Sequence, residues 1–85
     1  MSSNYKGANH ARTNRDAGFE LEERGVAAIR EIVGRRNEQV SADLGKSRGW
    51  LRQITNFKCR LSLVTLGEVM DLCGYDVEIV VRKRR

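Results

Sequence analysis

The sequence predicts a mostly helical domain of four to five helices that ends in a single β-strand. Apolar side chains recur at helical spacing between residues 16 and 74, and their period changes to strict alternation over residues 75–82. The chain has 85 residues, which is enough for one small domain. Because it contains no proline, we expect glycines and polar caps to set the helix ends.

Composition divides the chain into three parts. Residues 1–15 hold almost no large apolar side chain and are expected to form a flexible arm. Residues 16–74 carry the helical pattern, and residues 75–85 hold the alternating segment and a basic tail. No apolar run approaches the roughly 20 residues of a membrane span. The two cysteines do not make a disulfide framework, so we expect a cytoplasmic, nucleoid-associated protein with reduced thiols.

The first helix is expected to begin after an N-cap at Asp16 and to run to about Gly34. One apolar stripe at helical spacing comprises Leu21, Gly25, Ala28, Ile29 and Ile32. An adjacent stripe comprises Phe19, Val26 and Val33. The charged residues expected to be solvated are Glu20, Glu22, Glu23, Arg24, Arg30 and Glu31.

Three shorter helices are expected over residues 38–44, 48–55 and 63–73. Their predicted N-caps are the polar residues Asn37, Ser47 and Ser62. Glycines end the first and last of them, at Gly45 and Gly74. The residues expected to face inward are Val40, Leu44, Leu51, Ile54, Leu63, Leu66, Val69, Met70 and Cys73.

The C-terminal segment alternates Tyr75, Val77, Ile79 and Val81 with mostly polar residues, which predicts a strand with one apolar face. A lone strand cannot satisfy its own backbone groups, and no second strand is evident. We therefore expect dimerisation, with the same strand of another copy pairing antiparallel about a two-fold axis. Pairing with a different protein is the open alternative.

The spacing of residues 40–54 around Gly45 is that of a helix-turn-helix. Ser41 is small enough for two helices to cross closely, and Gly45 permits a left-handed turn. Leu51 and Ile54 would then hold the third helix against the first two.

Charge is segregated along the chain, whose net charge is +5. Residues 45–60 contain basic side chains and no acid, residues 61–81 contain acids and no base, and residues 82–85 are all basic. Such segregation predicts one positive face, which attracts polyanions such as nucleic acid. A merely solvated surface is the alternative.

Residues 37–74 resemble the Cro and phage-repressor (XRE-like) helix-turn-helix family. The resemblance includes the serine and leucine that open the fourth helix, Ser62 and Leu63, and the glycine that closes it, Gly74. The sequence departs from the family pattern at three positions. Ser41 stands where alanine is usual, Thr55 where glutamate is common and Phe57 where glycine is common.

This resemblance implies binding to double-stranded DNA, with the N-terminal half of the third helix in the major groove. The residues it places at base edges are Ser47, Arg48, Gly49, Arg52 and Gln53. Those it places near phosphates are Asn37, Gln39, Lys46, Trp50, Asn56, Lys58 and Arg60. Arg12 and Arg15 of the arm, or the basic tail, would add contacts or stay solvated.

The expected function is that of a homodimeric transcriptional regulator of bacterial or phage type that represses from a palindromic operator, since 85 residues leave no room for a ligand domain. The alternative is an antitoxin-type or recombination accessory protein that binds another protein, such as a toxin, through Phe19, Val26 and Val33. We expect no enzyme, cofactor or metal site. The single histidine, His10, lies in the arm, and Cys59 and Cys73 have no third ligand near them.

Overall fold

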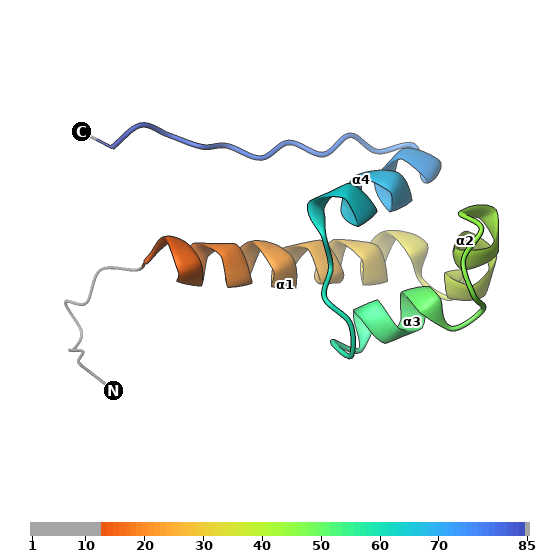
Figure 1. Cartoon of the computed structure of the whole chain (residues 1–85). Helices are drawn as coiled ribbons and strands as arrows, with labels where there is room; N and C mark the ends of the chain where they lie inside the picture. The colour runs from red at the N-terminus through yellow and green to blue at the C-terminus, as the bar shows by residue number, and fades with distance from the viewer. Residues whose placement is uncertain (1–12, 85) are drawn as a thin grey trace.

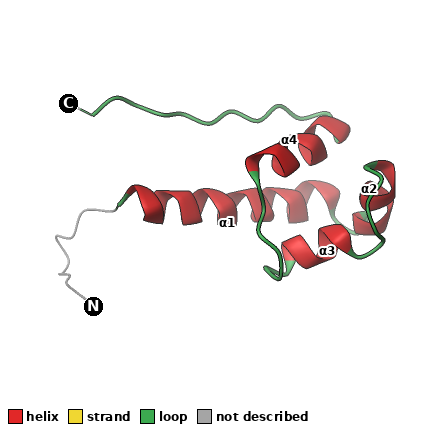
Figure 2. Ribbon diagram, in the orientation of Figure 1, coloured by secondary structure: helices red, strands yellow, loops and turns green. Residues whose placement is uncertain are grey.

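The computed structural model describes residues 13–84, in which four helices follow one another along the chain. They are α1 (Asn14–Val33), α2 (Asn37–Asp43), α3 (Trp50–Thr55) and α4 (Leu63–Leu72), as Figure 1 shows. The prediction of a small, mostly helical domain is therefore confirmed. Figure 2 shows no strand among these residues, so the C-terminal strand stays a prediction.

Helix α1 begins three residues earlier than the sequence pattern predicts, because the N-cap is Thr13 rather than Asp16. The Thr13 hydroxyl accepts the Asp16 amide at 3.1 Å, and the Asp16 carboxylate accepts the Thr13 amide at 3.3 Å. This reciprocal capping box satisfies two amides at the helix start. The prediction that Asp16 is the N-cap is therefore wrong, and Arg15 belongs to the helix rather than to an arm. Residues 1–12, with His10 and Arg12, lie outside the described residues.

One apolar core joins the four helices. Its buried members are Ile29, Val33, Val40, Leu51, Ile54, Val69 and Met70. Val26 is also buried, so two of the three residues predicted as a toxin-binding surface lie inside the domain, and that surface prediction is wrong. Leu21 and Leu63, predicted to face inward, are 44% and 61% exposed. The short α4 lies over the C-terminal half of α1, so no helix covers the first turns of α1 (Figure 1).

Helices α2, α3 and α4 end in the same hydrogen-bond motif, with a left-handed residue one position after the cap. The left-handed residue is Gly45 after α2, Phe57 after α3 and Gly74 after α4. Their φ angles are 71°, 59° and 83°. At Phe57, where the resembled family favours glycine, a side chain in this conformation costs about 1–2 kcal/mol. The Arg30 guanidinium lies 5.6 Å from the centroid of the Phe57 ring, a cation–π contact that offsets part of this cost.

The C-terminal segment leaves α4 and runs back along α1 as extended chain (Figure 1). The Tyr75 amide still closes α4 by donating to the Met70 carbonyl at 2.9 Å. A groove of about 370 Å³ lies where α1, α4 and the segment meet. Its apolar lining includes Leu21, Ala28, Ile32, Leu66, Val77 and Ile79. None of the helices in residues 13–84 has the length and apolar character needed to cross a membrane.

Candidate nucleic-acid interface

The turn between α2 and α3 is held by backbone hydrogen bonds that require a left-handed residue at Gly45. The Gly45 amide donates to the Ala42 carbonyl at 2.9 Å, and the Lys46 amide donates to the Ser41 carbonyl at 2.8 Å. Gly45 adopts φ of 71°, as its predicted role in the turn requires. The chain therefore reverses directly after α2, and the buried Val40 and Leu51 share the core on either side of the turn.

Ser41 does more than allow close packing of the two helices. Its side chain is fully buried, and its hydroxyl donates to the Asn37 carbonyl at 2.8 Å. The same oxygen accepts the backbone amide of Leu51 at 3.2 Å. That amide lies in the first turn of α3 and has no partner within its own helix. A side chain of α2 thus caps α3, which fixes the relative position of the two helices.

Replacing Ser41 with alanine is expected to destabilise the protein by about 1–3 kcal/mol, because the Leu51 amide would stay buried without an acceptor. Urea denaturation measures this difference directly. Ser47→Ala is the matched control, since Ser47 is exposed, and should change stability by less than about 0.5 kcal/mol. Equal stabilities of the two variants would rule out a capping role for Ser41.

Helix α3 begins at Trp50, with Gly49 as its N-cap, so the prediction that Ser47 caps a helix from residue 48 is wrong. The Ser47 carbonyl instead accepts the Trp50 amide at 3.1 Å in a turn that precedes the helix. Leu51, Ile54 and Thr55 are buried on one side of α3. The opposite face, at helical spacing, is formed by exposed residues, namely Gly49, Arg52, Gln53 and Asn56.

All five residues predicted at base edges are exposed, and their side chains differ in what they contact. Arg48 forms an ion pair with Glu38 of α2 at 3.0 Å, in which both side chains are largely exposed. The Gln53 side-chain oxygen accepts the Cys59 thiol at 3.5 Å. Arg52 extends from the centre of the exposed face, and Ser47 and Gly49 border it in the preceding turn.

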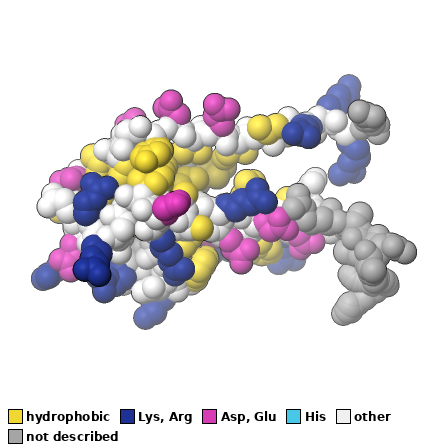
Figure 3. Space-filling model, turned by 180° about the vertical axis from the view of Figure 1, so that it is seen from behind, with side chains coloured by type: hydrophobic (Ala, Val, Ile, Leu, Met, Phe, Trp, Pro, Cys, Tyr) yellow, Lys and Arg dark blue, Asp and Glu magenta, His cyan; other side chains and the backbone are white. Residues whose placement is uncertain are grey.

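Among the residues predicted near phosphates, Asn56 lies on this face, and the others lie on α2, at the start of α3 and in the adjoining loops. Lys46, Lys58 and Asn56 are exposed, and the Lys46 ammonium lies 5.5 Å from the centroid of the Trp50 ring. Trp50 is half-buried against the core. On α2, Asn37 is half-buried and the Gln39 amide donates to the Asp43 carboxylate at 2.8 Å. Figure 3 shows Lys and Arg side chains gathered over the end of the molecule that α2 and α3 form.

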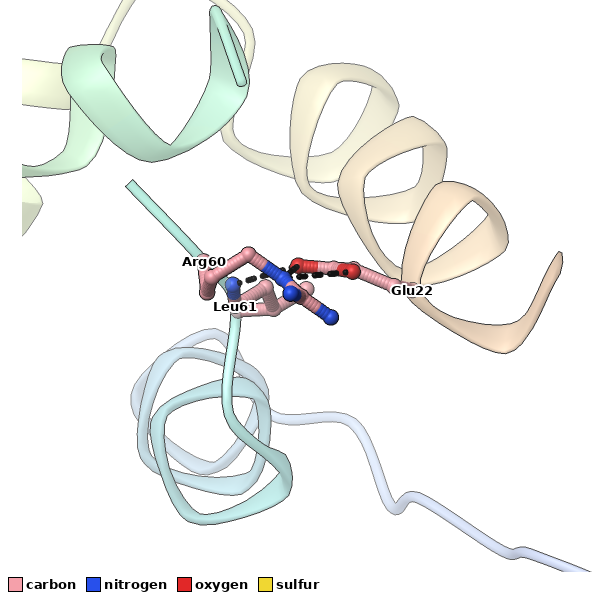
Figure 4. Close-up of polar contacts among 3 residues, drawn as sticks. All are labelled: Glu22, Arg60 and Leu61. Carbon is pink, nitrogen blue, oxygen red and sulfur yellow. Dashed lines mark hydrogen bonds and ion pairs between the residues drawn. The ribbon is translucent and has the colours of Figure 1, made fainter. Parts of the chain in front are cut away.

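Arg60, the last predicted phosphate contact, is joined to α1 through Glu22 (Figure 4). Its Nε donates to both Glu22 carboxylate oxygens, at 2.9 and 3.0 Å, and the Leu61 amide donates to one of them at 2.9 Å. The Glu22 side chain is only 15% exposed, so the prediction that it is solvated is wrong. Glu22 therefore fixes the loop that joins α3 to α4 against α1.

The hydrogen bonds from Arg60 and from the Leu61 amide lower the pKa of Glu22 below the ordinary value of a glutamate. A depressed carboxyl pKa contributes stability that is present above the pKa of the unfolded chain and is lost as pH falls through the folded-state pKa. We therefore expect Glu22→Gln to melt at a lower temperature than the parent near neutral pH. This gap should narrow as pH falls below the ordinary pKa of a glutamate, about 4.3, and should close below the lowered pKa of the folded state.

Thermal melting followed by circular dichroism at several pH values measures this gap. Glu23→Gln is the matched control, because it removes the same charge from the exposed neighbouring position. The assignment fails if both variants melt below the parent by the same amount at every pH.

Arg30 is a second residue of α1 whose role was not predicted. Arg30 is exposed, as predicted, but its guanidinium also donates to the Thr55 carbonyl at the end of α3. The carbonyls at a helix C-terminus lack partners within the helix, and a cation there is favourable. Arg30 thus holds the end of α3 and Phe57 against α1. Thr55 itself is buried, and its hydroxyl donates to the Arg52 carbonyl at 3.1 Å.

The two ends of α3 are therefore both fixed by side chains of other helices. Ser41 of α2 holds the first turn, and Arg30 of α1 holds the last. Contacts at both ends restrict how the helix can move, which lowers the entropy lost when its exposed surface binds a partner. No family model, no curated protein and no solved structure matches the chain.

Proposed function

We propose that the protein is a sequence-specific DNA-binding transcriptional repressor that acts as a homodimer on a palindromic operator. The observation that supports this most is the exposed face of α3 and the turn before it. Arg48, Arg52 and Gln53 project there, residues 45–60 contain no acid, and buried contacts fix the helix beneath. A protruding helix of this kind fits the major groove of DNA.

The chemistry of these three side chains suits base readout. An arginine donates two hydrogen bonds to guanine O6 and N7, and a glutamine pairs with adenine N6 and N7. Arg52 and Gln53 are adjacent on the exposed face, and Arg48 lies one turn earlier. We propose that Ser47 and Gly49 border the same base pairs, where Gly49 lets the backbone approach closely.

The surrounding residues would bind phosphates and so set the register of the protein on the duplex. We assign this role to Lys46, Asn56 and Lys58 beside α3, and to Asn37 and Gln39 on α2. Trp50 would contribute its indole N–H. Arg60 would use the guanidinium nitrogens that its Nε contact with Glu22 leaves available.

Dimerisation through residues 75–82 completes the proposal. In an antiparallel pair about a two-fold axis, each copy would place its α3 in one half-site. The half-site centres would then lie about one turn of DNA apart, roughly 34 Å. Bound in this way, the protein would repress by blocking access of the polymerase.

Alanine variants test the division between base readers and phosphate contacts. Each of Arg48→Ala, Arg52→Ala and Gln53→Ala should cost about 1–3 kcal/mol at particular base pairs and relax preference there. Lys58→Ala should weaken binding to all duplexes alike and reduce its salt dependence. The measurement is titration of each variant against the selected site and its single-base-pair variants. An equal loss on every sequence for all four variants would contradict base reading.

A further inference from the structure

The backbone of the C-terminal segment has no partner within the described chain once α4 is closed. The Tyr75 amide makes the last backbone hydrogen bond, and the described backbone of residues 76–84 makes none. A row of free amides and carbonyls in an extended segment is a template for pairing with another strand. Val77 and Ile79 line the groove along α1, as Asp76 and Glu78 also do, and they are still 40% and 41% exposed.

Charge along this segment is divided between its two ends. Asp76 and Glu78 stand at the start, and Arg82, Lys83 and Arg84 stand at the end. Figure 3 shows Lys and Arg side chains at the far end of the segment. When such a segment pairs antiparallel with its own copy, the acidic end of each strand meets the basic end of the other. The segment is therefore complementary in charge to itself, which favours a second copy of this chain as the partner.

The charges also discriminate among registers. A two-fold axis normal to the paired strands places one residue opposite itself at the centre, and residues equally distant from it face each other. With the centre at Val77, Asp76 would face the partner's Glu78, and with the centre at Glu78, this residue would face its own copy. Like charges directly opposite each other destabilise the pair of strands. A centre at Ile79 or Val81 would pair only one of the two acids with a base. A centre at Val80 pairs both acids with bases, and the opposite side of the paired strands, with Val77, Ile79 and Val81, then stays mostly apolar.

We infer that two copies pair through residues 76–84 with Val80 at the two-fold axis. Glu78 then lies opposite the partner's Arg82, and Asp76 lies opposite the partner's Arg84, which gives four oppositely charged pairs in the dimer. Ile79 lies opposite the partner's Val81 on the other side of the paired strands. This inference rests on the proposed homodimer and adds its register and the contacts that make it specific.

Charge reversal tests this register, because only one register allows a second reversal to restore pairing. Glu78→Arg alone, or Arg82→Glu alone, should raise the dimer dissociation constant roughly tenfold or more, since each turns two attractive pairs repulsive. The double variant with Glu78→Arg and Arg82→Glu should recover the parent value. If the axis were at Ile79, Asp76 would face the glutamate introduced at position 82 of the partner in the double variant. If the axis were at Val81, the arginine introduced at position 78 would face the partner's Arg84. Either arrangement prevents recovery.

Sedimentation equilibrium of the full chain measures these dissociation constants in the absence of DNA. The register of the dimer is therefore tested even if the protein does not bind DNA. Glu68→Arg is the matched control, because it makes the same charge change on α4 outside the segment. Circular dichroism checks that each variant keeps its helices. Recovery in the double variant supports the register. A double variant as weak as the single ones, single variants as tight as the parent, or a monomeric parent would overturn it.

Discussion

A chain truncated after Gly74 is expected to bind its palindromic site about 10²–10⁴-fold more weakly than the full chain. The loss arises because the α3 helices of the two copies would no longer be joined. Binding of one copy to its half-site would then not raise the local concentration of the other copy at the second half-site. Helices α1 to α4 contain every buried residue of the core and should keep their fold. Light scattering should show that the truncated chain is a monomer.

Two controls separate dimerisation from loss of the basic tail. On a duplex that carries a single half-site, the truncated chain should bind only slightly more weakly than the full chain. That small difference should be no larger than the loss of the charges of the basic tail explains. Ile79→Asp keeps the tail, places a charge on the mostly apolar side of the segment and should behave like the truncation. An unchanged mass and unchanged affinity after truncation would contradict dimerisation through this segment.

Replacing Leu51 with alanine should cost about 2–5 kcal/mol of stability, the largest effect we expect from a single core substitution. Leu51 is 0% exposed and lies in the cluster that joins α1, α2, α3 and α4. The expected loss is of the same order as the whole stability of a small domain, about 5–15 kcal/mol. A large fraction of the variant should therefore be unfolded at moderate temperature.

Urea denaturation of the parent and the variant measures this cost. Leu72→Ala removes the same atoms from the exposed last residue of α4 and should cost less than about 1 kcal/mol. Similar losses of stability for both variants would mean that Leu51 does not belong to the buried core. DNA binding by Leu51→Ala should fall in proportion to the fraction that is unfolded.

Local patterns in the sequence are sufficient to predict most of the helical elements. Ser62 caps α4 as expected, with its hydroxyl accepting the Thr65 amide at 3.1 Å. Gly45 and Gly74 end their helices in the left-handed conformation that the glycine signal predicts. These features depend on residues within one turn of each other, so their physical causes lie within a short stretch of sequence.

The contacts that fix the candidate site join residues far apart in the chain. Glu22 holds Arg60 from 38 residues away, and Arg30 holds Thr55 from 25 residues away. On a helical wheel both α1 residues look like solvated charges, because the wheel shows the period of a helix and not what packs against it. No local signal distinguishes them from Glu23 or Glu31.

The inward-facing residues show the same limit. Leu21 and Leu63 have the correct helical spacing, yet both are exposed. Leu21 is exposed because α4 is too short to cover the start of α1, and Leu63 is the first residue of α4. Val26 and Val33, from the second stripe, are buried instead of forming an outer surface. Periodicity predicts that a helix has an apolar face, whereas the lengths and crossing of its neighbours decide which part of that face is covered.

Selection of binding sites from a random pool of duplex DNA tests the central claim most directly. We predict enrichment of a palindrome whose half-sites are centred about one turn of DNA apart, roughly 10 base pairs. Base preferences within each half-site should relax when Arg52 or Gln53 is replaced by alanine. A selected pool with no enriched sequence at moderate salt would contradict the account.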